Sequence, residues 1–147
     1  MKYISIGYPL RFDDNMDYLI ELNNQIVKLT QDEFKCWCYI KDDNSDEVIK
    51  RLAKRGVVIT GDNDIDIIKK ILSKKLIRQG YGLAQDNKHC IYLGESCSYP
   101  SKVQYDIWLK SNGENKIMDI FGSLSGGYEF LFSELRELIE HDLIFVR

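Results

Sequence analysis

The 147-residue sequence predicts an α+β protein made of two related units packed as one compact body, each a hairpin followed by three helices. Three observations support this prediction. Apolar residues recur at spacings of three and four over several stretches, which is the pattern of amphipathic helices. Short runs rich in strand formers flank turn dipeptides such as Asn23-Asn24, which is typical of β-hairpins. Segments of the first half also recur in the second half.

Two helices are expected within residues 30–56. Thr30 and Glu33 are spaced as a capping box, which indicates that the first helix begins there. Ser45 is expected to cap the second helix, and Gly56 is expected to end it. Apolar residues at helical spacing would face the core from this second helix, namely Val48, Ile49 and Leu52.

Residues 62–79 carry the strongest helical pattern of the chain. Four apolar residues share one helix face at spacings of three and four, namely Ile65, Ile68, Leu72 and Leu76. Ile67 and Ile71 widen this apolar face. The helical spacing stops at Leu76. We therefore expect a helix that runs out into a strand and then into a hairpin with its turn at residues 85–88.

The same order of elements is expected again after Pro100. Ser101 has the character of a helix cap, and the helix after it reaches Trp108. A second helix is expected over residues 116–121 and a third over residues 128–140, followed by a strand that reaches the C-terminus.

Two pairs of segments indicate an internal repeat. Thr30–Trp37 matches Ser101–Trp108 in its cap, its aromatic residue and its tryptophan, all at one spacing. Leu72–Arg78 matches Ile139–Phe145 in its Leu-Ile ending. The difference between the two spacings falls in loops, where changes of length are tolerated. Chance likeness of generic amphipathic helices is the alternative, but the paired tryptophans favour a true repeat.

The helix that ends in Leu-Ile-Arg and enters a hairpin resembles the third helix and wing of winged helix-turn-helix proteins. The resemblance covers residues 18–92 and, less fully, residues 90–147. It is a likeness of pattern rather than of a diagnostic motif. It divides the chain into a winged-helix-like unit with a leading strand over residues 1–93 and an acidic winged-helix-like half over residues 94–147.

The resemblance implies a small DNA-binding or transcription-regulatory protein that contacts double-stranded DNA with the third helix and wing of its first unit. It places eight residues at the groove or at phosphates: Asn63, Lys69, Lys70, Ser73, Lys74, Arg78, Gln85 and Lys88. Residues 1–80 carry 14 Lys and Arg against 13 Asp and Glu, and the remainder carries 6 against 10. Nucleic-acid contact is therefore expected only from the first half.

Acidic residues at the start of the same helix oppose this function. Asp62, Asp64 and Asp66 would repel phosphate at the end that usually enters the groove. The alternative is a solvated helix in which Asp66 pairs with Lys69 and Lys70.

A different class of function fits the same pattern. Small peptide-recognition domains of modified-peptide biosynthesis are similar to winged helices, and they accept a leader peptide as an added strand. Here residues 18–29 would supply the strand edge. The chain is then a peptide- or protein-binding adaptor without DNA binding. A protein partner would also suit the acidic second half, and a homodimer stays open.

Catalysis is not expected, and neither is a metal or a cofactor. The sequence has no glycine-rich phosphate loop after a strand, no His-Glu-x-x-His motif and only two histidines. His141 falls in the last turn of a helix, where a cation is favoured. No apolar run approaches the roughly 20 residues of a membrane span, and no signal peptide is recognised, so a cytoplasmic protein is expected.

The four cysteines are expected to be reduced and mostly buried. Cys36 and Cys38 lie two apart on an expected helix, so their side chains diverge. Cys90 and Cys97 flank an expected turn and could approach each other, but they and His89 are too few for a zinc motif.

Overall fold

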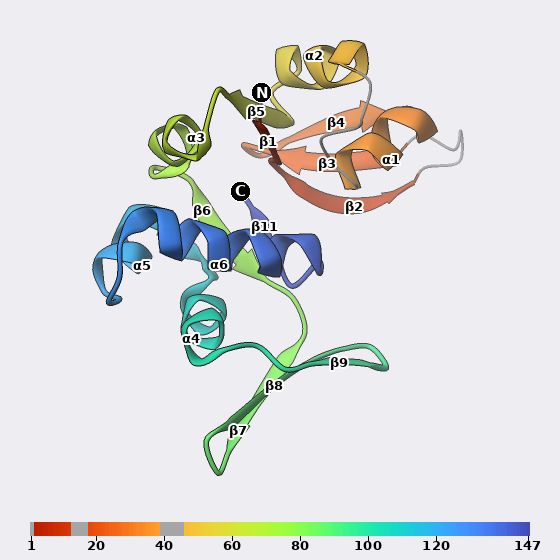
Figure 1. The fold of residues 1–147 in the computed structure, drawn as a ribbon. Helices are drawn as coiled ribbons and strands as arrows, with labels where there is room; N and C mark the ends of the chain where they lie inside the picture. Colours follow the sequence, from red (N-terminus) through yellow and green to blue (C-terminus); the bar gives the residue numbers. More distant parts are fainter. Residues whose placement is uncertain (1, 13–17, 39–45) are drawn as a thin grey trace. The chain divides into compact units, whose positions relative to one another are not determined.

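The structure, a computed structural model, describes residues 2–12, 18–38 and 46–147 (Figure 1). The described residues form helices and small antiparallel sheets, which confirms the expected α+β class. The expected cap Ser45 lies outside the described residues. The chain divides into two compact units, one of residues 1–70 with 146–147 and one of residues 71–145. This division falls after residue 70, whereas the sequence pattern placed it after residue 93.

Within the described residues, the first unit has four strands, then two helices, a further strand and a third helix. Its elements are β1 (Lys2–Ser5), β2 (Tyr8–Phe12), β3 (Tyr18–Leu22), β4 (Gln25–Leu29), α1 (Gln31–Cys38), α2 (Asp46–Lys54), β5 (Val58–Gly61) and α3 (Asp64–Ile71). β2, β3 and β4 form an antiparallel sheet in that order, and β1 pairs with β5. Asn23 and Asn24 both have positive φ, 52° and 63°, as the expected hairpin turn requires.

The second unit repeats this plan with additions. Its elements are β6 (Lys75–Arg78), β7 (Tyr81–Gln85), β8 (Lys88–Leu93), β9 (Ser96–Ser98), α4 (Lys102–Lys110), β10 (Asn112–Lys116), α5 (Ile117–Gly122), α6 (Tyr128–Glu140) and β11 (Ile144–Val146). One sheet has the order β7–β8–β9 and the other the order β10–β6–β11. The expected helices over residues 116–121 and 128–140 are confirmed within one residue.

The strongest helical pattern of the sequence forms a shorter helix than expected. α3 ends at Ile71, and β6 begins four residues later because its backbone pairs with β10 and β11. The buried face also differs from the expected stripe. Ile67, Ile68 and Ile71 are buried, whereas Ile65 is 45% exposed.

The two units share one order of elements and several hydrogen bonds. In each, a first strand is followed by a three-stranded meander, a capped helix, a second helix and a strand that returns to pair with the first. Trp37 donates its indole N–H to the carbonyl of Ile6 (3.1 Å), and Trp108 donates to the carbonyl of Gln79 (2.9 Å). Each carbonyl lies directly after the first strand of its unit, so both tryptophans tie the capped helix to the same place.

The C-terminal ends of α2 and α6 also match. Gly56 (φ 79°) and Asp142 (φ 59°) take the left-handed conformation that ends a helix. The next residue, Val57 or Leu143, donates its N–H back into the helix at 3.2 or 2.9 Å. α6 and β11 therefore correspond to α2 and β5. The sequence comparison had instead matched this segment with residues 72–78, and α3, α5 and β10 stand outside the shared plan.

Both capped helices begin as the sequence predicts. Thr30 and Glu33 exchange backbone and side-chain hydrogen bonds of 3.0 and 3.2 Å. Ser101 and Gln104 do the same at 3.0 and 3.1 Å. The two capping boxes occupy equivalent positions, which fixes the register between α1 and α4.

Candidate functional site

Three of the eight residues expected at DNA lie in the first unit, and two of them bond within it. Asn63 accepts a hydrogen bond from the backbone N–H of Asp66 (3.0 Å), so its side chain caps α3. Lys70 donates from Nζ to the carbonyl of Thr60 (2.6 Å). Lys69 is exposed. The start of α3 is therefore organised by its own cap.

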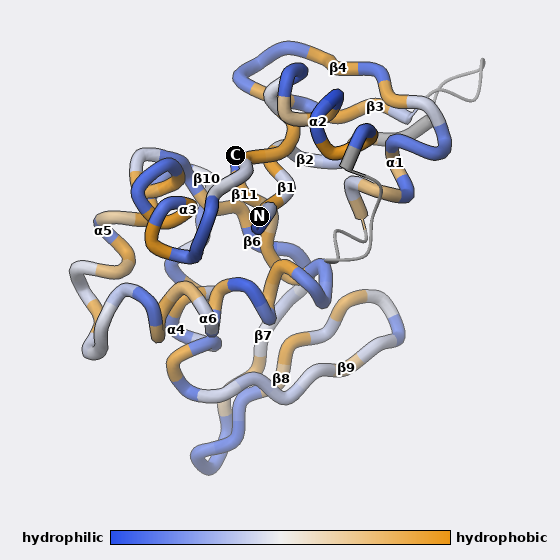
Figure 2. Tube along the Cα trace, turned by 45° about the horizontal axis from the view of Figure 1, so that its top comes forward, coloured by the Kyte–Doolittle hydropathy of each residue, from blue (hydrophilic) through white to orange (hydrophobic). Residues whose placement is uncertain are grey.

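The other five expected residues lie in the second unit: Ser73, Lys74, Arg78, Gln85 and Lys88. The Arg78 guanidinium donates to the carbonyl of Leu109 and lies 5.4 Å from the ring centroid of Trp108. This side chain therefore stabilises the unit itself. Gln85 and Lys88 are exposed and pair at the tip of the β7–β8 hairpin, which is hydrophilic (Figure 2).

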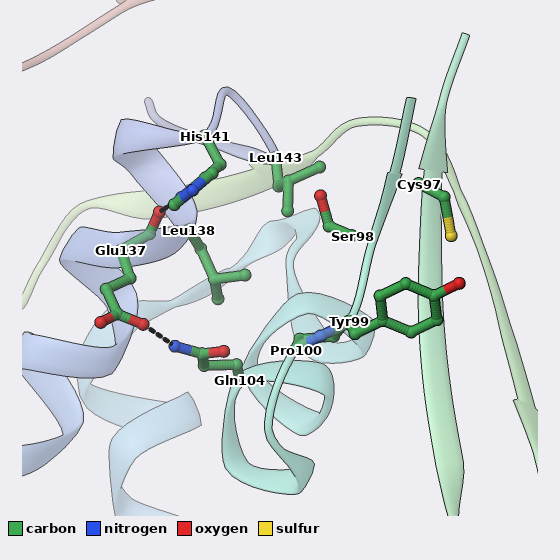
Figure 3. A pocket seen from close by; sticks show the side chains of 9 residues that line it. All are labelled: Cys97, Ser98, Tyr99, Pro100, Gln104, Glu137, Leu138, His141 and Leu143. Atoms are coloured by element: carbon green, nitrogen blue, oxygen red, sulfur yellow. Dashed lines mark hydrogen bonds between the residues drawn. The ribbon is translucent and has the colours of Figure 1, made fainter. Parts of the chain in front are cut away.

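A pocket of about 380 Å³ lies in the second unit between β9 and the C-terminal end of α6 (Figure 3). We call it the β9–α6 cleft; its lining residues are Cys97, Ser98, Tyr99, Pro100, Gln104, Glu137, Leu138, His141 and Leu143. Glu137 of α6 and His141, the residue after that helix, lie on one side, and Ser98 of β9 and Tyr99, the residue after that strand, lie on the other. The cleft thus joins a helix end to a strand.

The polar groups of the cleft hold one another in place. Gln104 donates from Nε2 to the carboxylate of Glu137, while its Oε1 belongs to the capping box of α4. His141 Nδ1 lies 2.7 Å from the backbone carbonyl of Glu137. Because a carbonyl only accepts, Nδ1 carries the proton of this bond. The single carboxylate of the cleft is therefore oriented by a neutral amide.

The equivalent place in the first unit is filled by an arginine. Arg55 and His141 each stand one residue before the positive-φ position that ends the second helix. The Arg55 guanidinium donates to both carboxylate oxygens of Glu33, at 3.3 and 3.4 Å, and to the backbone carbonyl of Lys28. Glu33 is the capping-box residue that corresponds to Gln104. An internal ion pair thus closes the gap that stays open in the second unit.

The charge of Arg55 also acts on the ionisation of its partner. Burial raises the pKa of Glu33, but the backbone N–H of Thr30 and the positive charge of Arg55 together favour the carboxylate more strongly. The net effect lowers the pKa of Glu33 below its ordinary value. The glutamate is therefore ionised at neutral pH and holds the arginine across the gap.

Two cysteines meet on the sheet beside the cleft. Cys90 Sγ and Cys97 Sγ lie 3.2 Å apart. The hydrogen bond with Cys97 raises the pKa of the Cys90 thiol, and the hydrogen bond with Cys90 raises the pKa of Tyr92 to about 12. Cys36 is buried as expected, but Cys97 is exposed. Among the described residues, no group of three or more His, Cys, Asp or Glu side chains could hold a metal ion.

The cleft residues were missed by the sequence analysis. His141 was assigned only to the end of a helix, Glu137 counted only as one of the acidic residues of the second half, and Gln104 was not singled out. The signal was the pair of capping boxes, one with glutamate and one with glutamine at the same position. It could be used only with the correct match of α6 to α2, which depends on strand pairing.

No protein-family model, curated protein or solved structure matches this chain. None of the helices in residues 2–12, 18–38 and 46–147 has the length and apolar character needed to cross a bilayer.

Proposed function

We propose that this chain is a peptide-binding protein whose second unit takes an extended peptide segment into the β9–α6 cleft. The observation that carries the proposal is the contrast between the two units. Arg55 closes the gap between helix and strand in the first unit, whereas the same gap in the second unit is an open pocket of about 380 Å³.

Among the described residues, the strand beside the cleft pairs on one side only. β9 is the terminal strand of the β7–β8–β9 sheet, and alternate residues of a terminal strand direct their backbone groups away from the sheet. Tyr99 and Lys28 each lie two residues before a helix cap. Because the Lys28 carbonyl is directed at Arg55, we expect the Tyr99 carbonyl to be directed at the cleft. An extended peptide can bond to such an edge.

Two buried leucines close the floor of the cleft, and an exposed aromatic ring stands at its side. Leu138 and Leu143 line it and are 2% and 3% exposed, so they are anchored in the core of the unit. Tyr99 is 77% exposed. Alternate side chains of an added strand point to opposite sides, so one set would point into the cleft while the other faces solvent.

The likeness of each unit to winged-helix peptide-recognition domains is part of this proposal. Its support is the three-stranded sheet followed by a capped helix in each unit. The strand edge of the first unit, within residues 18–29, was the edge expected from the sequence. Because Arg55 already bonds to Lys28 there, we assign the peptide to β9 instead.

The charges favour a peptide over DNA. Residues 71–145 carry 8 Lys and Arg against 10 Asp and Glu. α3 has Asp64 and Asp66 in its first turn, and Lys70 already donates to a carbonyl of its own unit. Duplex DNA, whose binding depends on cation–phosphate contacts, finds little support in this distribution.

The proposal is tested by selecting ligands from a displayed random peptide library against the immobilised full chain. Selected peptides are then titrated calorimetrically against wild type and against the double variant Gln104→Glu/His141→Arg. This variant rebuilds the Glu33–Arg55 pair in the second unit, so it should fill the cleft from within. We expect binding to weaken by at least about tenfold, or about 1.4 kcal/mol.

The exposed residue Lys69 supplies a matched control, because Lys69→Ala should bind the selected peptides as wild type does. Equal binding to wild type and to the filled variant, or the failure to select any peptide, would overturn the proposal. A mobility-shift assay with duplex DNA runs in parallel. A salt-dependent shift that is lost in Lys69→Glu/Lys70→Glu/Lys74→Glu would establish DNA binding in its place.

A further inference from the structure

We propose that the peptide taken by the β9–α6 cleft carries an arginine, whose guanidinium lies beside Glu137 as the Arg55 guanidinium lies beside Glu33 in the first unit. This inference rests on the proposed function and names the chemistry of its ligand. It follows from three observations: what fills the equivalent gap, which charge the open cleft retains, and how that charge is held.

The first unit shows what a gap of this construction accepts. Arg55 reaches from the end of α2 and bonds at once to a carboxylate and to the backbone carbonyl of Lys28. Its partner Glu33 is 7% exposed, whereas the Arg55 side chain is 37% exposed, so the carboxylate lies at the base of the gap and the arginine covers it from the solvent side. A guanidinium therefore satisfies both the side-chain and the backbone acceptor of this geometry.

The second unit keeps a carboxylate but lacks the cation. Glu33 is replaced by Gln104 at the capping position, while Glu137 introduces a carboxylate on α6 four residues before His141. The nine residues that line the cleft include no lysine or arginine. Glu137 receives the neutral amide of Gln104, which orients the carboxylate without neutralising it. A cationic side chain from a ligand would complete the pair.

The acceptors of the cleft favour arginine over lysine. A guanidinium is planar and has five N–H donors in a fixed fork, so it can bond to the Glu137 carboxylate and to the expected Tyr99 carbonyl together. A lysine ammonium is a compact, strongly hydrated point charge and does not match two separated acceptors as well. The Arg55 contacts in the first unit are of the forked kind.

The rest of α6 adds negative charge near the cleft. Glu134 and Glu140 lie within one turn of Glu137 on the same helix. The only cation of this helix is Arg136, whose guanidinium lies 4.8 Å from the ring centroid of Phe132. The local charge is therefore complementary to a cationic ligand.

The inference is tested with one peptide selected by the wild-type chain and its versions carrying Lys, citrulline or Gln in place of each arginine. We expect citrulline and Gln to weaken binding at least about tenfold, and Lys to fall between them and Arg. With Glu137→Gln, the same replacements should change binding by less than about twofold, because the carboxylate is gone. Circular dichroism verifies that Glu137→Gln remains folded.

A reverse experiment uses the first unit. Arg55→Ala removes the internal guanidinium and leaves Glu33 at the base of the gap, so this variant should gain a second site for the same arginine peptide. The gained site should be absent in Arg55→Ala/Glu33→Gln. If Arg55→Ala does not fold, the effect of the arginine replacements on binding to wild type and to Glu137→Gln decides alone.

The outcomes separate the inference from the function. Peptides that bind the cleft without any preference for arginine, or with a preference that persists in Glu137→Gln, overturn the inference and leave peptide binding intact. The failure of every peptide overturns the proposed function itself.

Discussion

Arg55 and His141 occupy the same position in two units of the same plan, yet only Arg55 bonds across the gap between its helix and its strand edge. His141 turns back to a carbonyl of its own helix, at 2.7 Å. Two exchanged residues, Arg55 to His141 and Glu33 to Gln104, thus separate a closed gap from an open cleft, and the matched capping-box hydrogen bonds make the comparison direct.

The two indole hydrogen bonds should contribute separately to stability. Trp37→Phe leaves the carbonyls of Ile6 and Val57 without their indole partner, and Trp108→Phe does the same to the carbonyl of Gln79. We expect each change to lower the free energy of unfolding by about 1–3 kcal/mol in urea titrations. Tyr128→Phe is the control, because this ring is 43% exposed. A loss no larger than that of the control would contradict the assignment.

The ion pair of the first unit should make its stability depend on acid pH. The folded pKa of Glu33 lies below its ordinary value of 4.5, so the carboxylate contributes stability above that pH, which is lost as the pH falls through the folded pKa. The difference in unfolding free energy between wild type and Glu33→Gln should be largest at neutral pH, on the order of 1 kcal/mol, and should shrink as the pH falls below 4.5 and through the folded pKa. Urea titrations across this range measure it, and a constant difference would refute it.

Gly80 should tolerate no side chain. Its φ is 81°, and a Cβ atom there would lie 2.2 Å from the backbone carbonyl oxygen of Tyr92. Gly80→Ala should therefore lower the thermal midpoint by several degrees, corresponding to more than about 1 kcal/mol. Gly122→Ala is the matched control, because nothing lies within 4 Å of a Cβ there. Equal midpoints for the two variants would show that the close approach to Tyr92 is not maintained.

The thiols of Cys90 and Cys97 should form a disulfide when an aromatic disulfide reagent is added. The exposed Cys97 thiolate attacks the reagent and releases one aromatic thiolate. Cys90 then attacks the mixed disulfide and releases the second. Cys90→Ser should stop at a stable adduct on Cys97, which mass spectrometry distinguishes from the internal disulfide. A stable adduct in wild type would show that the two sulfurs do not approach.

Local features of the chain could be predicted from the sequence with good accuracy. The caps at Thr30 and Ser101, the Asn23-Asn24 turn and the helix over residues 128–140 depend on neighbours within a few residues. Their physical determinants are the short-range hydrogen bonds of the two caps, the tolerance of asparagine for positive φ and, for the helix, the helical spacing of its apolar residues.

The sequence by itself determined the α+β class, the starts of the two capped helices α1 and α4, and the likeness between the two tryptophan-bearing segments. Only the tertiary structure decided that α6 corresponds to α2, because that match follows from long-range pairing of β5 with β1 and of β11 with β6. The cleft depends on the same pairing. Gln104 and Glu137 are far apart in the chain, and no local pattern indicates that folding brings them together at the edge of β9.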